Sequence, residues 1–271
     1  MRISDTAKER SLMSVKEKWA VITGASSGIG TELAKLYSTR GFDIVLVARR
    51  KERLEELAAK LKCQTRIIAA DLSDREQCKA VFGEVEDLNV QLLVNCAGFG
   101  ALGQFEQIDP DRQADMIAVN CTALTILTQM FLKDFKYRDS GAILNVASSA
   151  GLMPGGPGMA VYYATKAFVV SLTNGIFEEL RSAGSHVKIS ALCPGPVDTE
   201  FNDVAGSDFG MKGITPQYCA KCAARGLDHG ERIIIPEEAF SAARIAAKVV
   251  PERMSMKIVG LNQSSKLGGL L

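Results

Sequence analysis

The chain has 271 residues, of which 47% are hydrophobic and 23% are charged, a composition that excludes disordered, collagen-like and low-complexity proteins. Lysine and arginine number 32 against 31 acidic residues, for a net charge of +1, so we expect no nucleic-acid partner. Seven scattered cysteines and the lack of an apolar run of signal-peptide or membrane-spanning length favour a soluble protein of the reducing cytoplasm.

Short apolar runs alternate with helical stretches along the chain, which is the pattern of β-α-β units and a parallel sheet. The helical period is clear over 51–62, where Leu54, Leu57 and Leu61 recur among charged residues. A second helix is expected over 216–227. The predicted strands cover residues 19–23, 44–47, 67–70, 92–95, 143–147, 187–192 and 231–235.

A glycine-rich turn follows the first predicted strand and opens a helix that is expected to begin near Thr31. Glycines permit a tight turn and close backbone approach, and the free N–H groups of a helix start favour a pyrophosphate. The spacing G-x-x-x-G-x-G departs from the G-x-G-x-x-G fingerprint and lacks the G-K-[ST] of a P-loop, so an ATPase is disfavoured. A turn without a ligand is the alternative. The residues predicted to bind a cofactor here are Gly24, Ser26, Ser27, Gly28, Ile29 and Gly30.

The second predicted strand ends in the pair Arg49-Arg50, with no carboxylate beside it. About 20 residues beyond such a turn, an acidic residue binds the ribose hydroxyls, whereas an arginine accommodates a 2′-phosphate. The pair therefore favours NADP(H) over NAD(H), and we assign the phosphate to Arg49, since Arg50 can equally begin a solvated helix. Asp71 and Leu72 are expected beside the adenine, although Asp71 could equally belong to a helix start capped by Ser73.

Tyr162 and Lys166 lie four residues apart and would meet on one helix face. An ammonium group close to a phenol favours the phenolate, so we expect Lys166 to lower the pKa of Tyr162 and make it a general acid. Such pairs also arise by chance in amphipathic helices. Only two histidines occur, and neither lies in a G-x-S-x-G or H-E-x-x-H pattern, which disfavours serine hydrolase and zinc peptidase chemistry.

Taken together, these motifs resemble those of the short-chain dehydrogenase/reductase family over roughly residues 16–235. The resemblance rests on T-G-x-x-x-G-x-G, Asn95-Cys96-Ala97-Gly98, Asn120, Ser148, Y-x-x-x-K and Pro194-Gly195. It implies a Rossmann-like, doubly wound, seven-stranded parallel sheet with helices on both faces, in three αβα layers. It also implies hydride transfer between a nicotinamide cofactor and a carbonyl carbon.

The resemblance assigns roles to individual residues. Tyr162 would protonate the carbonyl oxygen, Lys166 would support Tyr162 and bind the nicotinamide ribose, and Ser148 would polarise the same oxygen. Asn120 would hold a water that links Lys166 to solvent. The turn beside the adenosine ribose would contain Asn95, Ala97 and Gly98, and the nicotinamide would be lined by Pro194, Gly195, Val197 and Thr199.

The catalytic serine is ambiguous by spacing. In the family it precedes the tyrosine by 13 residues and a glycine by three; Ser149 satisfies the first rule and Ser148 the second. A glycine-rich loop before Tyr162 is an easy place for one inserted residue, so we favour Ser148. Its other interpretation is a strand-end serine that satisfies a local backbone group.

Three further segments complete the analysis. Cys219 and Cys222 form a C-x-x-C, but no second pair supports a metal site, and we expect a packed helix face. The glycine-rich stretch 206–213 is expected to cover the substrate. With no linker, we expect one domain over 15–240, after a loose leader over 1–14 and before a basic amphipathic segment over 241–271, interpreted as an interface or lid rather than a membrane contact.

The sequence thus predicts an NADPH-dependent reductase of ketones or aldehydes that also runs in reverse, with a small-molecule substrate and a homodimeric or homotetrameric assembly. No metal is expected. A 3-oxoacyl thioester or a hydroxysteroid is the alternative substrate. A non-catalytic NADP(H)-binding regulator or a membrane-peripheral protein is the alternative function.

Overall fold

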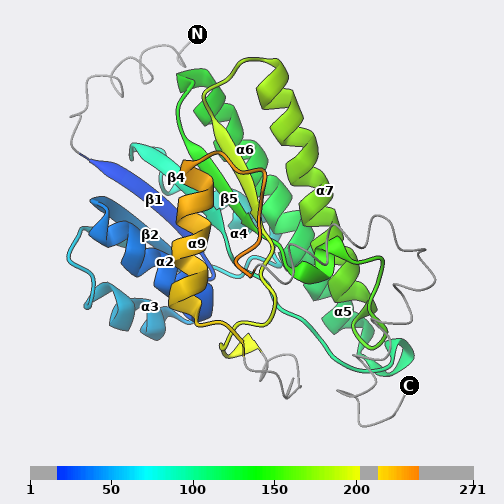
Figure 1. The fold of residues 1–271 in the computed structure, drawn as a ribbon. Helices are drawn as coiled ribbons and strands as arrows, with labels where there is room; N and C mark the ends of the chain where they lie inside the picture. Colours follow the sequence, from blue (N-terminus) through cyan, green and yellow to red (C-terminus); the bar gives the residue numbers. More distant parts are fainter. Residues whose placement is uncertain (1–16, 202–212, 238–271) are drawn as a thin grey trace.

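The computed structural model describes residues 17–201 and 213–237, which form one seven-stranded parallel sheet between two layers of helices (Figure 1). The strand order is β3-β2-β1-β4-β5-β6-β7, so the predicted three-layer, doubly wound fold is confirmed. The strands are β1 (Lys18–Thr23), β2 (Phe42–Ala48), β3 (Thr65–Ala69), β4 (Val90–Asn95), β5 (Ala142–Val146), β6 (Lys188–Leu192) and β7 (Ile233–Ile234).

The central strands are continuous apolar runs because helices cover both of their faces. In β1, every residue after Lys18 is buried, and Val21 pairs with Val45 of β2 on one side and Leu93 of β4 on the other. The last strand is shorter than predicted: only Ile233 and Ile234 pair with β6, rather than the whole of 231–235.

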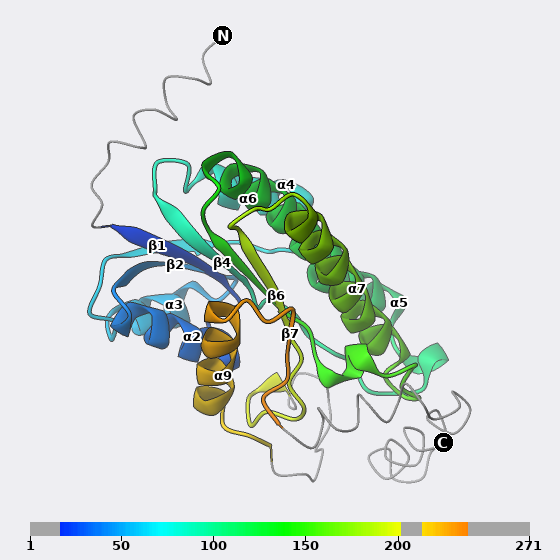
Figure 2. The same cartoon turned by 45° about the horizontal axis from the view of Figure 1, so that its top comes forward.

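One face of the sheet packs against α2 (Gly28–Thr39), α3 (Lys51–Ala58) and α9 (Pro216–Asp228). The opposite face packs against α4 (Arg75–Gly83), α6 (Leu124–Arg138) and α7 (Ala160–Ser182), as Figure 2 shows. Two helices differ from expectation: α2 begins three residues before Thr31, and the regular helix predicted over 51–62 ends at Ala58.

The helical stretch from Pro110 to Arg138 joins α5 (Pro110–Ile117), the π-helical turn η2 (Ala118–Ala123) and α6. By length and hydropathy alone this stretch could cross a membrane. The expectation that the chain has no apolar segment of membrane-spanning length therefore needs correction. Its side chains Leu127, Phe131 and Phe135 are buried against the sheet. Core helices of soluble proteins satisfy the same criterion, so this helix is weak evidence for a membrane span.

The order of the strands reverses between β1 and β4, where the chain turns from building one half of the sheet to the other. In open α/β sheets a crevice forms there, outside the carboxyl ends of the strands. The predicted leader over 1–14, most of the loop over 206–213 and the segment over 241–271 lie outside the described residues.

Candidate active site

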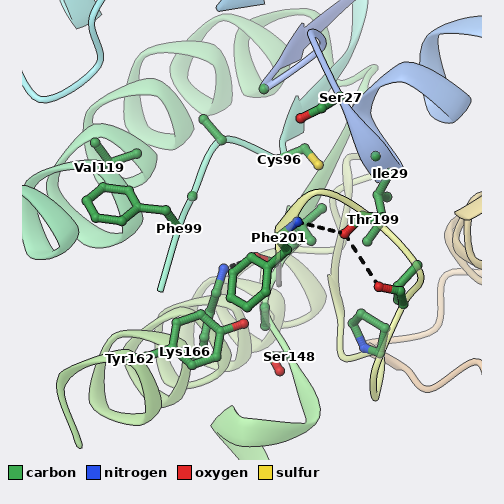
Figure 3. Close-up of a pocket in the computed structure, with 18 of the residues that line it drawn as sticks. Ser27, Ile29, Cys96, Phe99, Val119, Ser148, Tyr162, Lys166, Thr199 and Phe201 are labelled. Carbon is green, nitrogen blue, oxygen red and sulfur yellow. Dashed lines mark hydrogen bonds between the residues drawn. The ribbon is translucent and has the colours of Figure 1, made fainter. Parts of the chain in front are cut away.

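A cavity of about 540 Å³ opens at the carboxyl ends of the strands. Its walls come from the segments that follow β1 to β6, so residues far apart in sequence meet there (Figure 3). Of the predicted site residues, it is lined by Gly24, Ser26, Ser27, Gly28, Ile29, Arg49, Asp71, Leu72, Ala97, Gly98, Ser148, Tyr162, Lys166, Pro194, Gly195, Val197 and Thr199. Gly30, Asn95 and Asn120 do not line it.

The glycine turn after β1 forms one wall of the cavity. Gly24 has a φ of +67°, and a Cβ there would lie 2.8 Å from the backbone nitrogen of Ala97, so glycine allows the turns after β1 and β4 to touch. Gly30 does not line the cavity, contrary to the prediction that it binds the cofactor directly. A Cβ there would lie 2.8 Å from the carbonyl carbon of Gly24, so glycine is needed at this position for packing.

The start of α2 suits an anion. Its N-cap residue, Ser27, makes no side-chain hydrogen bond to the helix, and no acidic residue lies in the first turn. The first N–H groups of a helix have no intrahelical partner and favour negative charge. An uncapped helix start beside Cβ-free residues therefore fits a pyrophosphate group.

The two arginines after β2 make different contacts. Arg49 lines the cavity and has no hydrogen bond or ion pair with residues 17–201 or 213–237. Arg50 turns toward the glycine turn and donates from Nη2 to Ser26 Oγ at 3.1 Å. Its Nη1 also donates to Glu200 Oε2 at 3.0 Å. Arg50 is therefore more than the start of a solvated helix.

Asp71 lines the cavity, as predicted, but the alternative placing it at a helix start capped by Ser73 needs correction. Its Oδ1 accepts from the backbone nitrogen of Ser73 at 3.0 Å and from the Ser73 hydroxyl at 2.9 Å. The cap of α4 is Asp74, whose carboxylate accepts from the nitrogens of Glu76 and Gln77.

Asn95 is a core residue rather than a neighbour of the predicted ribose site. Its Nδ2 donates to Thr128 Oγ1 at 3.0 Å and to Asn145 Oδ1 at 2.9 Å, which ties β4 to α6 and β5. The turn that follows is held by Thr23, whose Oγ1 accepts from the backbone nitrogens of Cys96 and Ala97. Buried amides bond to one another because an unpaired polar group in a core is costly.

Tyr162 and Lys166 lie on α7 and both face the cavity (Figure 3). Burial raises the pKa of Tyr162 to about 12, an effect that the Ser148 side chain partly opposes, and burial lowers the pKa of Lys166 to about 8. Lys166 Nζ lies 5.8 Å from the Tyr162 ring centroid and donates to the Val146 carbonyl at 2.9 Å. The expectation that Lys166 lowers the pKa of Tyr162 is thus corrected, because desolvation outweighs a distant ammonium group.

Ser148, rather than Ser149, is the serine whose side chain acts on the pKa of Tyr162 and lowers it. Ser148 also caps the short 3-10 helix η3 (Ser149–Leu152), since its Oγ accepts from the Ala150 nitrogen at 3.1 Å. Ser149 donates its backbone nitrogen to the Pro194 carbonyl at 2.7 Å. Geometry therefore favours Ser148 as the partner of Tyr162.

Asn120 lies in the π-helical turn η2, a kind of turn that is frequent at functional sites. Its Oδ1 accepts from the Phe99 nitrogen at 3.1 Å, and its Nδ2 donates to the Phe99 carbonyl and to Thr165 Oγ1, both at 3.0 Å. The side-chain amide of Asn120 is thus fully hydrogen-bonded to protein groups, so a relay water would have to bind the backbone carbonyl of Asn120.

Several cavity residues were not predicted. Phe201 packs against Tyr162 with ring centroids 5.3 Å apart, and Phe99 and Val119 stand opposite them (Figure 3). Glu237 does not line the cavity itself, but it accepts from the backbone nitrogen of Gly195, which does, at 3.1 Å. None of these lies in a recognisable motif, and single apolar or acidic residues in loops give no sequence signal until the fold brings them together.

The C-x-x-C lies on α9, away from the cavity. Cys219 is buried in the core and Cys222 is partly buried, as free thiols. In residues 17–201 and 213–237, no group of three or more His, Cys, Asp or Glu side chains could hold a metal ion.

Comparison with known proteins identifies the family. A family model described as short chain dehydrogenase matches residues 18–208. An uncharacterized oxidoreductase of Staphylococcus epidermidis is 36% identical over 226 residues, which are 82% of this chain and 96% of the relative. A 7beta-hydroxysteroid dehydrogenase of Clostridium sardiniense is 32% identical over 69% of this chain and 73% of its own. A very-long-chain 3-oxoacyl-CoA reductase of Anas platyrhynchos is 32% identical over 76% of this chain and 67% of its own.

Solved structures of similar fold point to the same family. A short-chain dehydrogenase from Sphingobium yanoikuyae in complex with NADPH has a TM-score of 0.76 and 34% identity, covering 86% of this chain and 96% of its own. A short chain dehydrogenase/reductase from Burkholderia phymatum in complex with NAD has a TM-score of 0.78 and 25% identity, covering 85% and 92%. The resemblance seen in the motifs is confirmed: the chain belongs to the short-chain dehydrogenase/reductase family and is an oxidoreductase.

Proposed function

We propose that this protein reduces a ketone or aldehyde to an alcohol with NADPH, reversibly, at the cavity that contains Ser148, Tyr162 and Lys166. The main support is one observation: the side chains of Ser148, Tyr162 and Lys166 line the same cavity, and the Ser148 side chain opposes the rise that burial causes in the pKa of Tyr162. When bound, the cofactor supplies the hydride for reduction and accepts it in the reverse direction.

In this proposal, the protein's own residues handle the proton. Tyr162 is neutral at pH 7, because burial raises its pKa to about 12, and a neutral phenol is the form that can donate to a carbonyl oxygen. Ser148 donates to the same carbonyl oxygen and so polarises the carbon for attack. Lys166 then returns a proton to Tyr162, and a water held by the backbone carbonyl of Asn120 links Lys166 to solvent.

The preference for NADPH over NADH rests on charge at the adenosine end. Arg49 and Arg50 line the cavity beside the glycine turn, and Arg49 has no partner among residues 17–201 and 213–237. Guanidinium groups bind phosphate by paired, charge-assisted hydrogen bonds. The Sphingobium relative was solved with NADPH, although the Burkholderia one was solved with NAD.

The substrate end of the cavity favours an apolar ketone. Near Tyr162 the walls are formed by Phe99, Val119, Met159 and Phe201, and among the described residues that line this end Lys166 is the only charged one. Such walls suit a hydrophobic substituent and would desolvate an anionic one at a cost. A hydroxysteroid or a 3-oxoacyl thioester, the substrates implied by the names of two relatives, remains the alternative class.

Replacing Tyr162 by phenylalanine tests this proposal. The variant Tyr162→Phe keeps the ring packed on Phe201 but removes the proton donor, so turnover of NADPH with a panel of apolar ketones should fall about a thousandfold. The Kd for NADPH should change less than twofold. Undiminished turnover in the variant would refute the role of Tyr162, and weaker NADPH binding would show damage to the cavity.

We also propose a reducing, cytoplasmic location and a homodimeric or homotetrameric assembly. All seven cysteines are free thiols, as is usual where glutathione keeps cysteines reduced. The half-exposed Ile117 and Phe168 lie on α5 and α7, two helices in contact with each other, and could pack against a second copy. Sedimentation of the protein and of an Ile117→Glu, Phe168→Glu variant would test the assembly.

A further inference from the structure

The segment from Val197 to Phe201 runs along the mouth of the cavity and touches both of its ends. A Cβ on Gly28 would lie 3.0 Å from Thr199 Cγ2, so Thr199 packs on the glycine turn. Phe201 packs on Tyr162. The segment is fixed at its start by a parallel bridge between Val197 and Ile214. Glu200 is thereby held over the adenosine end.

Glu200 is bound by two arginines, Arg50 of the opposite cavity wall and Arg53 of α3, which does not line the cavity. Its Oε2 accepts from Arg50 Nη1 at 3.0 Å, and its Oε1 accepts from Arg53 Nη1. Both guanidinium groups lower the pKa of the Glu200 carboxyl, so it is ionised at neutral pH. Arg50 also bonds Ser26 of the glycine turn, which places this cluster at the end of the cavity where the adenosine part of a dinucleotide would lie.

The net charge of this cluster is similar in size and opposite in sign to the charge of a phosphate group. Arg49, Arg50 and Arg53 contribute three positive charges and Glu200 one negative charge, which leaves a net charge of +2. A phosphate monoester carries about −1.5 to −2 near pH 7. The nearest other carboxylate on the cavity wall, Asp71, is engaged by Ser73. Arg49 has no partner among the described residues, so a phosphate bound there could gain a second arginine only by taking contacts that Glu200 now holds on Arg50 or Arg53.

We propose that Glu200 is a determinant of cofactor selectivity, which competes with the cofactor's 2′-phosphate for Arg50 and Arg53. This inference rests on the proposed function, since it requires a nicotinamide dinucleotide in the cavity. Glu200 weakens the binding of NADPH, which carries the phosphate, and has little effect on NADH, which does not. Selectivity for NADPH is then lower than the three arginines alone would give.

The variant Glu200→Gln separates this role from others. It keeps the size and one acceptor of the side chain but removes its charge. Glu178→Gln is the matched control, because Glu178 is a similarly exposed carboxylate that also pairs with two arginines, Arg181 and Arg232, but lies outside the cavity. The Kd values for NADPH, NADH and adenosine 2′,5′-bisphosphate are measured by titration of the full-length protein at low salt.

The expected result is an NADPH affinity about fivefold tighter in Glu200→Gln, the upper range for an exposed ion pair. Adenosine 2′,5′-bisphosphate should gain equally, and NADH should change less than twofold. The gain should shrink at high salt, and Glu178→Gln should match the wild type. An unchanged NADPH-to-NADH ratio would overturn the inference, as would a selective loss of NADH binding, which would mean that Glu200 binds ribose hydroxyls. Wild-type protein that binds neither dinucleotide would instead refute the proposed function.

Discussion

The buried charge of Lys166 should impose a pH-dependent penalty on folding. Only 6% of the residue is exposed, its Nζ has one hydrogen bond, to the Val146 carbonyl, and no carboxylate is among the groups that act on its pKa. Burial therefore lowers its pKa to about 8, from 10.5 in the unfolded chain. Replacement by methionine, of similar length, removes the charge.

The sign of the effect follows from proton binding. Between about pH 8 and 10.5 the unfolded chain holds the lysine proton more tightly than the folded one, so the contribution of Lys166 to stability rises with pH. The charged amine costs about 3 kcal/mol at pH 7 and about 1 kcal/mol at pH 10, a relief of about 2 kcal/mol. In Lys166→Met the penalty is absent at both pH values, although the Val146 carbonyl loses its donor, at a cost of about 1 to 3 kcal/mol.

The assay is urea unfolding of wild type and Lys166→Met at pH 7 and pH 10, without cofactor. Other groups titrate in the same window, but they contribute equally to both proteins and cancel in the difference between them. We expect the free energy of unfolding of wild type, relative to the variant, to rise by about 2 kcal/mol from pH 7 to pH 10. Parallel pH profiles for the two proteins would refute the argument, since they would mean that Lys166 is not charged in a desolvated site.

Two further predictions concern the cavity. Ser148→Ala should lower turnover about a hundredfold or more by removing a hydrogen bond to the reacting oxygen, whereas Ser149→Ala should retain most activity; the opposite order in steady-state rates would exchange their roles. Gly30→Ala should weaken NADPH binding at least tenfold and lower the free energy of unfolding by about 1 to 3 kcal/mol, because the added Cβ would collide with the Gly24 backbone. Gly175→Ala, in an open helical position, is the control and should stabilise by about 0.5 to 1 kcal/mol; equal behaviour of the two in thermal unfolding and titration would contradict the packing argument.

The sheet could be predicted because its order follows from local signals. Apolar runs such as that of β1 are long enough to mark a strand buried on both faces, and glycines mark the turn that follows. The first and last residues of helices and strands were harder to predict from the sequence. The helix after the glycine turn begins at Gly28 rather than near Thr31. Gly28 has a φ of +53°, a turn conformation that glycine permits and that a helix-propensity argument does not expect at a helix start.

The residues of the site could be predicted in identity but only partly in role. Asn95 stands in a recognisable motif, yet its neighbours Thr128 and Asn145 come from elements 33 and 50 residues away, and these contacts make it a core residue. Glu200 has no motif at all. Its position opposite Arg50 depends on how the segment after β6 returns across the sheet, which is decided by the bridge of Val197 with Ile214.

The electrostatics of the site show most clearly where sequence reasoning fails. Spacing correctly places Tyr162 and Lys166 on one helix, and at that range a charge alone would favour the phenolate. Both side chains are, however, enclosed by the walls of the cavity, and burial opposes charge on each: the pKa of the phenol rises and that of the amine falls. The free protein therefore holds the proton on Tyr162 and holds Lys166 closer to neutrality. An anionic group that entered the cavity beside Lys166 would raise its pKa again, so occupancy of the site, rather than the sequence spacing, sets the charge that supports proton transfer.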